Sequence, residues 1–207
     1  KDHPAFAGYV IRDEPHADLF PLLREINDAF RAEDPRHEPF INLFPSYGTI
    51  HQLGFEDYRA YIRSFIETVQ PGILSYDNYP TRLDTTLYEA WYNDLRIVRE
   101  ETLKAGIPFM VFILSEGIRE GLRLPDRAEV LWQVNSAIAY GSQGFGWFCY
   151  WTPPTYEPPE GAENVHVEHH HDAMINIRGE KTPIYDHVKE ANAYIKKVGT
   201  ELLSWES

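Results

Sequence analysis

Short apolar runs and segments with helical spacing alternate along the whole chain, and this alternation constrains the fold more than any other feature. Each run is rich in β-branched or aromatic residues, ends in a polar cluster, and is followed by apolar residues at helical spacing. The expected strands cover residues 9–11, 39–44, 72–76, 108–114 and 146–151. The expected helices begin near residues 19, 55, 85, 126 and 184 and end near residues 35, 69, 105, 140 and 203.

Five strand–helix units with nearly continuous apolar strands predict an α/β fold with a parallel sheet buried on both faces. An open doubly wound sheet and a section of a (β/α)-barrel both fit this order. Glu14, Asp77, Glu116 and Trp151 lie at or just past the carboxyl ends of the expected strands, which favours the barrel, where the site lies at these ends. No Gly-rich phosphate loop follows a strand. A complete barrel takes about 250 residues. We therefore expect residues 1–207 to form one partial TIM-barrel-like domain, with three units missing from its N-terminal side.

Composition excludes some partners and leaves others open. The formal net charge of −13 disfavours nucleic acid and anionic membranes as partners, and no apolar run is long enough to cross a bilayer. Aromatic residues make up 14% of the chain, which fits either a sugar-stacking cleft or an aromatic core. The single cysteine, Cys149, precludes an internal disulfide and is expected to be a buried, inert thiol. The cellular compartment stays unassigned.

Four segments together carry a family resemblance. They are residues 8–15 (GYVIRDEP), 139–151 (AYGSQGFGWFCYW), 178–185 (RGEKTPIY), and the closing helix that begins at 188–192 (VKEAN). In this order they resemble the C-terminal part of clan A glycoside hydrolases, and are similar to the family 42 β-galactosidases. The resemblance implies that the five strands are equivalent to strands four to eight of a (β/α)8 barrel.

The resemblance also implies a chemistry. It places the acid/base carboxyl at Glu14 and the nucleophile at Glu116, although the clan has Asn at the position of Asp13. A retaining glycosidase needs two carboxyl groups about 5 Å apart. Asp77 is the rival second carboxyl, or else an anchor for a sugar hydroxyl. Asp13 and Glu14 are neighbours in sequence, so only one of them is expected to face the centre of the barrel.

Candidate sugar-binding residues lie near the same strand ends. Trp151 is expected to stack on a sugar ring, with packing at the barrel rim as the alternative. Tyrosines and asparagines near the strand ends are weaker candidates, since Asn is also common in turns. These candidates are Tyr47, Tyr76, Tyr79, Asn42 and Asn78.

A histidine-rich segment, residues 166–172 (HVEHHHD), suggests a metal site, because zinc binds His and carboxylate ligands. No second ligand group at a recognisable spacing accompanies it, and neighbours in one loop seldom all reach one ion. We expect a solvated loop here, with neither metal nor cofactor.

Three hypotheses of function remain. The first is a glycosidase acting on a β-linked sugar, and the second is a partial barrel that binds carbohydrate or serves a structural role. The third, a metal-dependent hydrolase, rests on the histidine segment. In all three, the open strand edges at residues 8–11 and 146–151 need a cover. Either the remainder of a longer chain or a second copy in a homodimer is expected to supply it.

Overall fold

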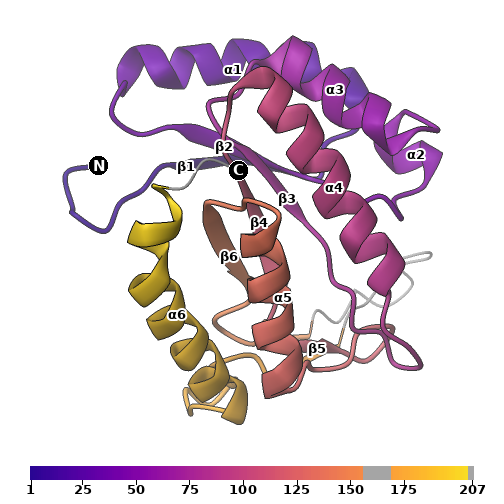
Figure 1. The fold of residues 1–207 in the computed structure, drawn as a ribbon, viewed down its shortest axis with the longest axis vertical. Helices are drawn as coiled ribbons and strands as arrows, with labels where there is room; N and C mark the ends of the chain where they lie inside the picture. The colour runs from indigo at the N-terminus through magenta and orange to yellow at the C-terminus, as the bar shows by residue number, and fades with distance from the viewer. Residues whose placement is uncertain (156–168, 205–207) are drawn as a thin grey trace, which may run out of the picture. The chain divides into compact units, whose positions relative to one another are not determined.

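The computed structural model of the chain describes residues 1–155 and 169–204 and shows strands that alternate with helices (Figure 1). Adjacent strands from β1 to β4 pair in parallel. The strands of the main sheet are in chain order, without the reversal of a doubly wound sheet, as in a barrel. This confirms the predicted fold class. The strands are β1 (Tyr9–Asp13), β2 (Pro39–Leu43), β3 (Leu74–Asp77), β4 (Phe109–Leu114) and β6 (Gly144–Phe148).

The long helices follow the predicted segments, and their ends carry the expected signals. Asp126 and Glu129 each accept a hydrogen bond from the other's backbone amide, forming a capping box at the start of α5. Gly106, with a φ of +68°, ends α4 in the left-handed conformation. The helices are α1 (Phe20–Glu33), which follows the short 3-10 helix η1 (Ala17–Leu19), α3 (Tyr58–Val69), α4 (Tyr88–Ala105), α5 (Arg127–Ala139) and α6 (Pro183–Leu202).

Three features differ from the expectation. The last strand was predicted over residues 146–151, but β6 begins earlier, at Gly144, and ends at Phe148. A four-residue helix, α2 (Ile50–Leu53), lies in the segment predicted as loop, where Thr49 and Gln52 form a capping box. Two short strands, β5 (Gly117–Ile118) and β7 (His170–His171), form a separate antiparallel pair. Each is only two residues long, too short for a pattern to show.

The described chain divides into two compact units. Unit 1 comprises residues 1–78, 89–112 and 140–145, and unit 2 comprises residues 79–88, 113–139 and 146–207. In unit 1, α1 packs on α3. The rings of Tyr61 and Phe65, on α3, lie 5.4 and 5.3 Å from that of Phe20 on α1. All three side chains are buried, so this aromatic cluster forms much of the core of unit 1.

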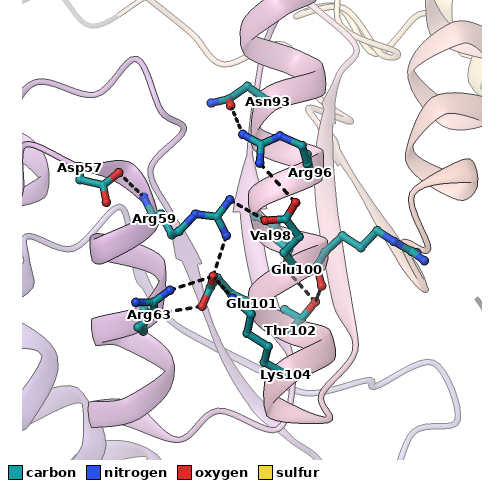
Figure 2. Close-up of polar contacts among 11 residues, drawn as sticks. Asp57, Arg59, Arg63, Asn93, Arg96, Val98, Glu100, Glu101, Thr102 and Lys104 are labelled. Carbon is teal, nitrogen blue, oxygen red and sulfur yellow. Dashed lines mark hydrogen bonds and ion pairs between the residues drawn. The ribbon is translucent and has the colours of Figure 1, made fainter.

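An ion-pair network joins α3 to α4 within unit 1 (Figure 2). The carboxylate of Glu101 is only 4% exposed and accepts hydrogen bonds from Arg59 at 2.7 Å, Arg63 at 3.1 Å and Lys104 at 2.8 Å. Burial opposes ionisation of Glu101, but the hydrogen bonds from these cations lower its pKa to about 2. Glu101 therefore stays charged at neutral pH and holds the two helices together.

Unit 2 has its own core. Helices α5 and α6 pack together, and Arg127 and Glu190 form an ion pair between them. Leu114, Ile118 and Leu122 form a separate apolar cluster near the end of β4. Among the described residues, no helix combines the length and the apolar character needed to cross a membrane.

Candidate functional site

In unit 1, a row of polar side chains crosses three neighbouring strands near their carboxyl ends. Strand register sets Asn42 of β2 opposite Asp13 of β1 and Ser75 of β3. The Asn42 side-chain amide donates to Asp13 Oδ1 at 3.0 Å and to Asp77 Oδ1 at 2.9 Å. Its carbonyl oxygen accepts a hydrogen bond from Ser75 Oγ at 3.0 Å. Asn42 was predicted as a sugar ligand, and its amide joins the predicted site carboxyl group of Asp77 to Asp13.

Glu14 leaves the strand in an unusual backbone conformation. Its φ is +44°, in the left-handed region that residues other than glycine seldom adopt, and its amide donates to Asn42 O at 2.8 Å. The alternation of the strand ends at Asp13, so the expectation that only one of Asp13 and Glu14 faces the centre of the barrel stays a prediction. The negative charges of both carboxylates raise the pKa of Asp77. Backbone strain of this kind is common at functional positions.

Asp77 is the most perturbed carboxyl group of this cluster. It is buried at the end of β3, and its burial raises its pKa well above the usual range. The negative charges of Glu14 and Asp13 raise this pKa further, and the hydrogen bond from Asn42 opposes them. Asp77 therefore favours the protonated form, next to Glu14, a half-buried carboxylate. A buried carboxyl group that holds its proton near other carboxylates is suited to acid–base chemistry.

The remaining predicted ligands in unit 1 divide between the core and the surface. Tyr76 and Asn78 are fully buried, whereas Tyr47 is exposed. The Asn78 amide donates to Asp94 Oδ2 at 2.8 Å, and the Ser46 backbone amide donates to the same oxygen at 3.0 Å. Of these three predicted ligands, only Tyr47 lies where a ligand reaches it without rearrangement of the core.

Asp94 is a buried carboxyl group that the sequence analysis missed. Burial raises its pKa to about 6, although hydrogen bonds from Ser46 and Asn78 lower it in part. Asp94 lies within α4, and its position in the helical pattern does not distinguish it from the other polar residues of this helix. The polar run at residues 93–94 in an otherwise amphipathic helix was the available signal.

Unit 2 contains a second cluster, centred on Glu116. The carboxyl group of Glu116 is fully buried. The thiol of Cys149 donates to Oε2 at 3.0 Å, and Nδ1 of His170 lies 2.7 Å from Oε1. Both carboxylate oxygens thus have partners, and neither partner was predicted. Burial and the adjacent Glu116 carboxylate raise the pKa of the Cys149 thiol, in keeping with the expected inert cysteine.

Two residues of the histidine segment, His169 and His170, contact carboxylates of residues distant in the sequence. His170 contacts Glu116, and His169 contacts Glu120 through its backbone amide at 3.0 Å and through its ring. The solvated-loop expectation is therefore wrong for His170, whose side chain is 11% exposed, whereas the His169 side chain is 41% exposed. Residues 166–168 lie outside the described residues. Among residues 1–155 and 169–204, no three His, Cys, Asp or Glu side chains are placed to hold a metal ion.

The two aromatic candidates in unit 2 occupy different environments. Trp151 is 49% exposed and is open to stacking. Tyr79 is half-buried and stacks on Phe148, with ring centroids 5.3 Å apart and an interplanar angle of 22°. The Phe148 ring in turn lies 6.3 Å from that of His170. An aromatic wall therefore lies next to the Glu116 cluster.

Comparison with known proteins supports the fold. No protein-family model and no curated protein matches the chain. Among solved structures, it is similar to a polyextremophilic β-galactosidase from the Antarctic haloarchaeon Halorubrum lacusprofundi, with a TM-score of 0.57 and 15% sequence identity. The similarity covers 91% of this chain and 26% of that one, so the chain spans about a quarter of the β-galactosidase. At this identity the likeness concerns the fold, a partial (β/α)-barrel.

Proposed function

We propose that the chain is a glycoside hydrolase, or part of one, that acts on a β-linked sugar by a retaining mechanism. Glu14 is the acid/base, and Asp77 or Glu116 is the second carboxyl group. The observation that carries the proposal is a buried carboxyl group, Asp77, at the carboxyl end of β3, whose pKa is raised by its burial and by the charge of Glu14. The structural likeness to a β-galactosidase is consistent with this chemistry.

The assigned chemistry follows from the environments of the groups. Glu14 is half-buried, so its carboxyl group is accessible to a leaving-group oxygen. It protonates that oxygen in the first step and activates water in the second. The second carboxyl group attacks the anomeric carbon, which requires it to be ionised. For Asp77, burial and the charges of Glu14 and Asp13 oppose this ionisation, and the hydrogen bond from the Asn42 amide offsets them only in part, which counts against Asp77 in this role.

The first test is hydrolysis of a panel of aryl α- and β-glycosides by the chain and by a Glu14→Gln variant. We expect turnover of one β-glycoside and a loss of about 10²–10⁴-fold in the variant. The loss should be largest for leaving groups that need protonation and small for dinitrophenolate. Glu25→Gln, which changes an exposed carboxylate on α1, is the matched control. Equal losses for both kinds of leaving group would contradict an acid/base role.

The second carboxyl group is identified separately. A 2-deoxy-2-fluoro glycoside should trap a covalent glycosyl-enzyme, and the mass of the labelled peptide distinguishes Asp77 from Glu116. Asp77→Asn and Glu116→Gln should then show which substitution abolishes trapping. Trapping at neither residue, with turnover intact, would contradict the retaining mechanism.

A second candidate function is carbohydrate binding without hydrolysis. The environment of Glu116 favours it, since this carboxylate is fully buried and both of its oxygens have partners in Cys149 and His170. A sugar that binds in calorimetry without turnover, and binds more weakly after Trp151→Ala, would support this function over the first.

A further inference from the structure

The two outer strands of the described sheet are more exposed than the strands between them. All four residues of β3 are buried, whereas all five of β6 are only half-buried, and Val10 of β1 is 67% exposed. The β6 sequence, GFGWF, has no charged residue and no proline, the usual features that protect a free edge. Both edge strands thus resemble strands that pair with a further strand.

A hollow of about 570 Å³ adjoins β6 in unit 2 (Figure 1 shows β6 and α6). Trp147 of β6 lies against α6 there, and its indole nitrogen donates to Asn192 Oδ1 at 3.2 Å. Two lysines, Lys189 and Lys196, line this hollow, and neither has an ion-pair partner among the described residues. We call it the basic hollow, and its lining includes Trp147, Tyr150, Tyr185, Lys189, Asn192 and Lys196.

A smaller hollow of about 220 Å³ adjoins β1 in unit 1, between that strand and α1. Its charge differs from that of the basic hollow, because two carboxylates and one lysine line it. Glu33 has no ion-pair partner in the described part of the chain. We call it the acidic hollow, and it is lined by Lys1, Tyr9, Ala29, Phe30, Glu33 and Asp34.

We infer that the chain associates with a second copy of itself by placing β1 and α1 of one copy against β6 and α6 of the other. A parallel strand added to β6 satisfies its free backbone groups and covers its apolar residues. The acidic hollow of one copy then faces the basic hollow of the other, which brings Glu33 close to the unpaired lysines. Because the two surfaces differ, the contact is heterologous, and each copy offers both halves of it.

Two substitutions block one surface each without touching the core. Val10→Lys places a charge on the exposed side of β1, and Ala193→Arg fills the basic hollow from the exposed side of α6. Each should weaken self-association by about tenfold or more in sedimentation equilibrium, because the contact then contains a desolvated charge. Leu103→Lys and Ala105→Arg, at exposed positions on α4, are matched controls and should associate like the unmodified chain. Circular dichroism checks that all four variants fold.

A mixing experiment separates this arrangement from other modes of association. The Val10→Lys chain retains an intact β6 surface, and the Ala193→Arg chain retains an intact β1 surface. An equimolar mixture should therefore form a heterodimer through the one contact whose two halves are both intact, although neither variant associates strongly with itself. Higher salt should weaken the dimer, since part of the attraction is between charges.

Three results would overturn the inference. The first is an unmodified chain that stays monomeric over the whole concentration range, as expected if a different polypeptide segment covers these edges. The second is a mixture that remains monomeric although both variants are folded. The third is equal dissociation of the control variants, which would place the contact elsewhere. None of these readouts depends on glycosidase activity, so they are independent of the proposed function.

Discussion

The thiol of Cys149 lies 3.0 Å from the buried carboxylate of Glu116, and this carboxylate opposes ionisation of the thiol. Glu116 disfavours the thiolate, which is the form that reacts with alkylating agents. Glu116→Gln should therefore lower the thiol pKa and accelerate alkylation by iodoacetamide at pH 8 several-fold. Cys149 is the single cysteine of the chain, so the labelling rate reports on one site.

Glu120→Gln is the control for this experiment, because Glu120 is paired with His169 rather than with the thiol. An unchanged labelling rate in Glu116→Gln, with the fold intact, would mean that the carboxylate does not control the thiol.

Removal of the Glu101 carboxylate should weaken the joint between α3 and α4 (Figure 2). Glu101→Gln leaves three cations without their shared acceptor, and we expect a loss of about 1–2 kcal/mol, because two of the three partners are largely exposed. Since the folded pKa, about 2, lies below the ordinary value of 4.5, this stabilisation is complete above pH 4.5. It is lost as the pH falls toward 2. Urea unfolding at several pH values measures it.

The Glu25→Gln variant, on the exposed side of α1, should leave unchanged both the stability at neutral pH and its decrease at low pH. A Glu101→Gln variant as stable as the unmodified chain at pH 7 would show that this network contributes nothing to the free energy of unfolding.

Asp94 should make the chain less stable as the pH rises. Its folded pKa, about 6, lies above the ordinary value of 3.8, so the folded chain binds this proton more tightly than the unfolded chain. The free energy of unfolding should therefore fall by about 2–3 kcal/mol between pH 4 and pH 6. Asp94→Asn should remove this fall while its carbonyl still accepts from Ser46 and Asn78. The exposed Asp84→Asn is the control, and a pH dependence unchanged in Asp94→Asn would disprove the assignment.

Asn42→Ala should affect both stability and the ionisation of Asp77. The substitution removes the donor to Asp77 and Asp13 and the acceptor for Ser75, so we expect a loss of about 1–3 kcal/mol. Without the amide, the pKa of Asp77 should rise further, which carboxyl NMR titration follows directly. Asn135→Ala, at an exposed position on α5, is the control, and an Asp77 titration that stays the same would contradict the role given to Asn42.

The strands and long helices were predictable because local pattern determines them. β4 is a continuous apolar run, and the Asp126–Glu129 cap is visible as two residues at fixed spacing. The start of β6 was missed because Gly144 and Gly146 carry no side chain to signal a strand.

The places of the candidate carboxyl groups near strand ends were predictable from the sequence, and their contacts were not. Glu14, Asp77 and Glu116 were identified because they follow strands. Their partners were not, since these depend on pairings across long sequence separations. His170 meets a carboxylate 54 residues away, and the contacts of Asn42 depend on the register of three strands.

That register has a consequence for any attempt to transplant or redesign this cluster. A slip of β2 by one residue would turn Asn42 to the opposite face of the sheet and separate it from Asp13, Ser75 and Asp77 at once. The arrangement is therefore a property of three strands taken together. A graft of the loops alone onto another scaffold would carry the residues across without the geometry that relates them.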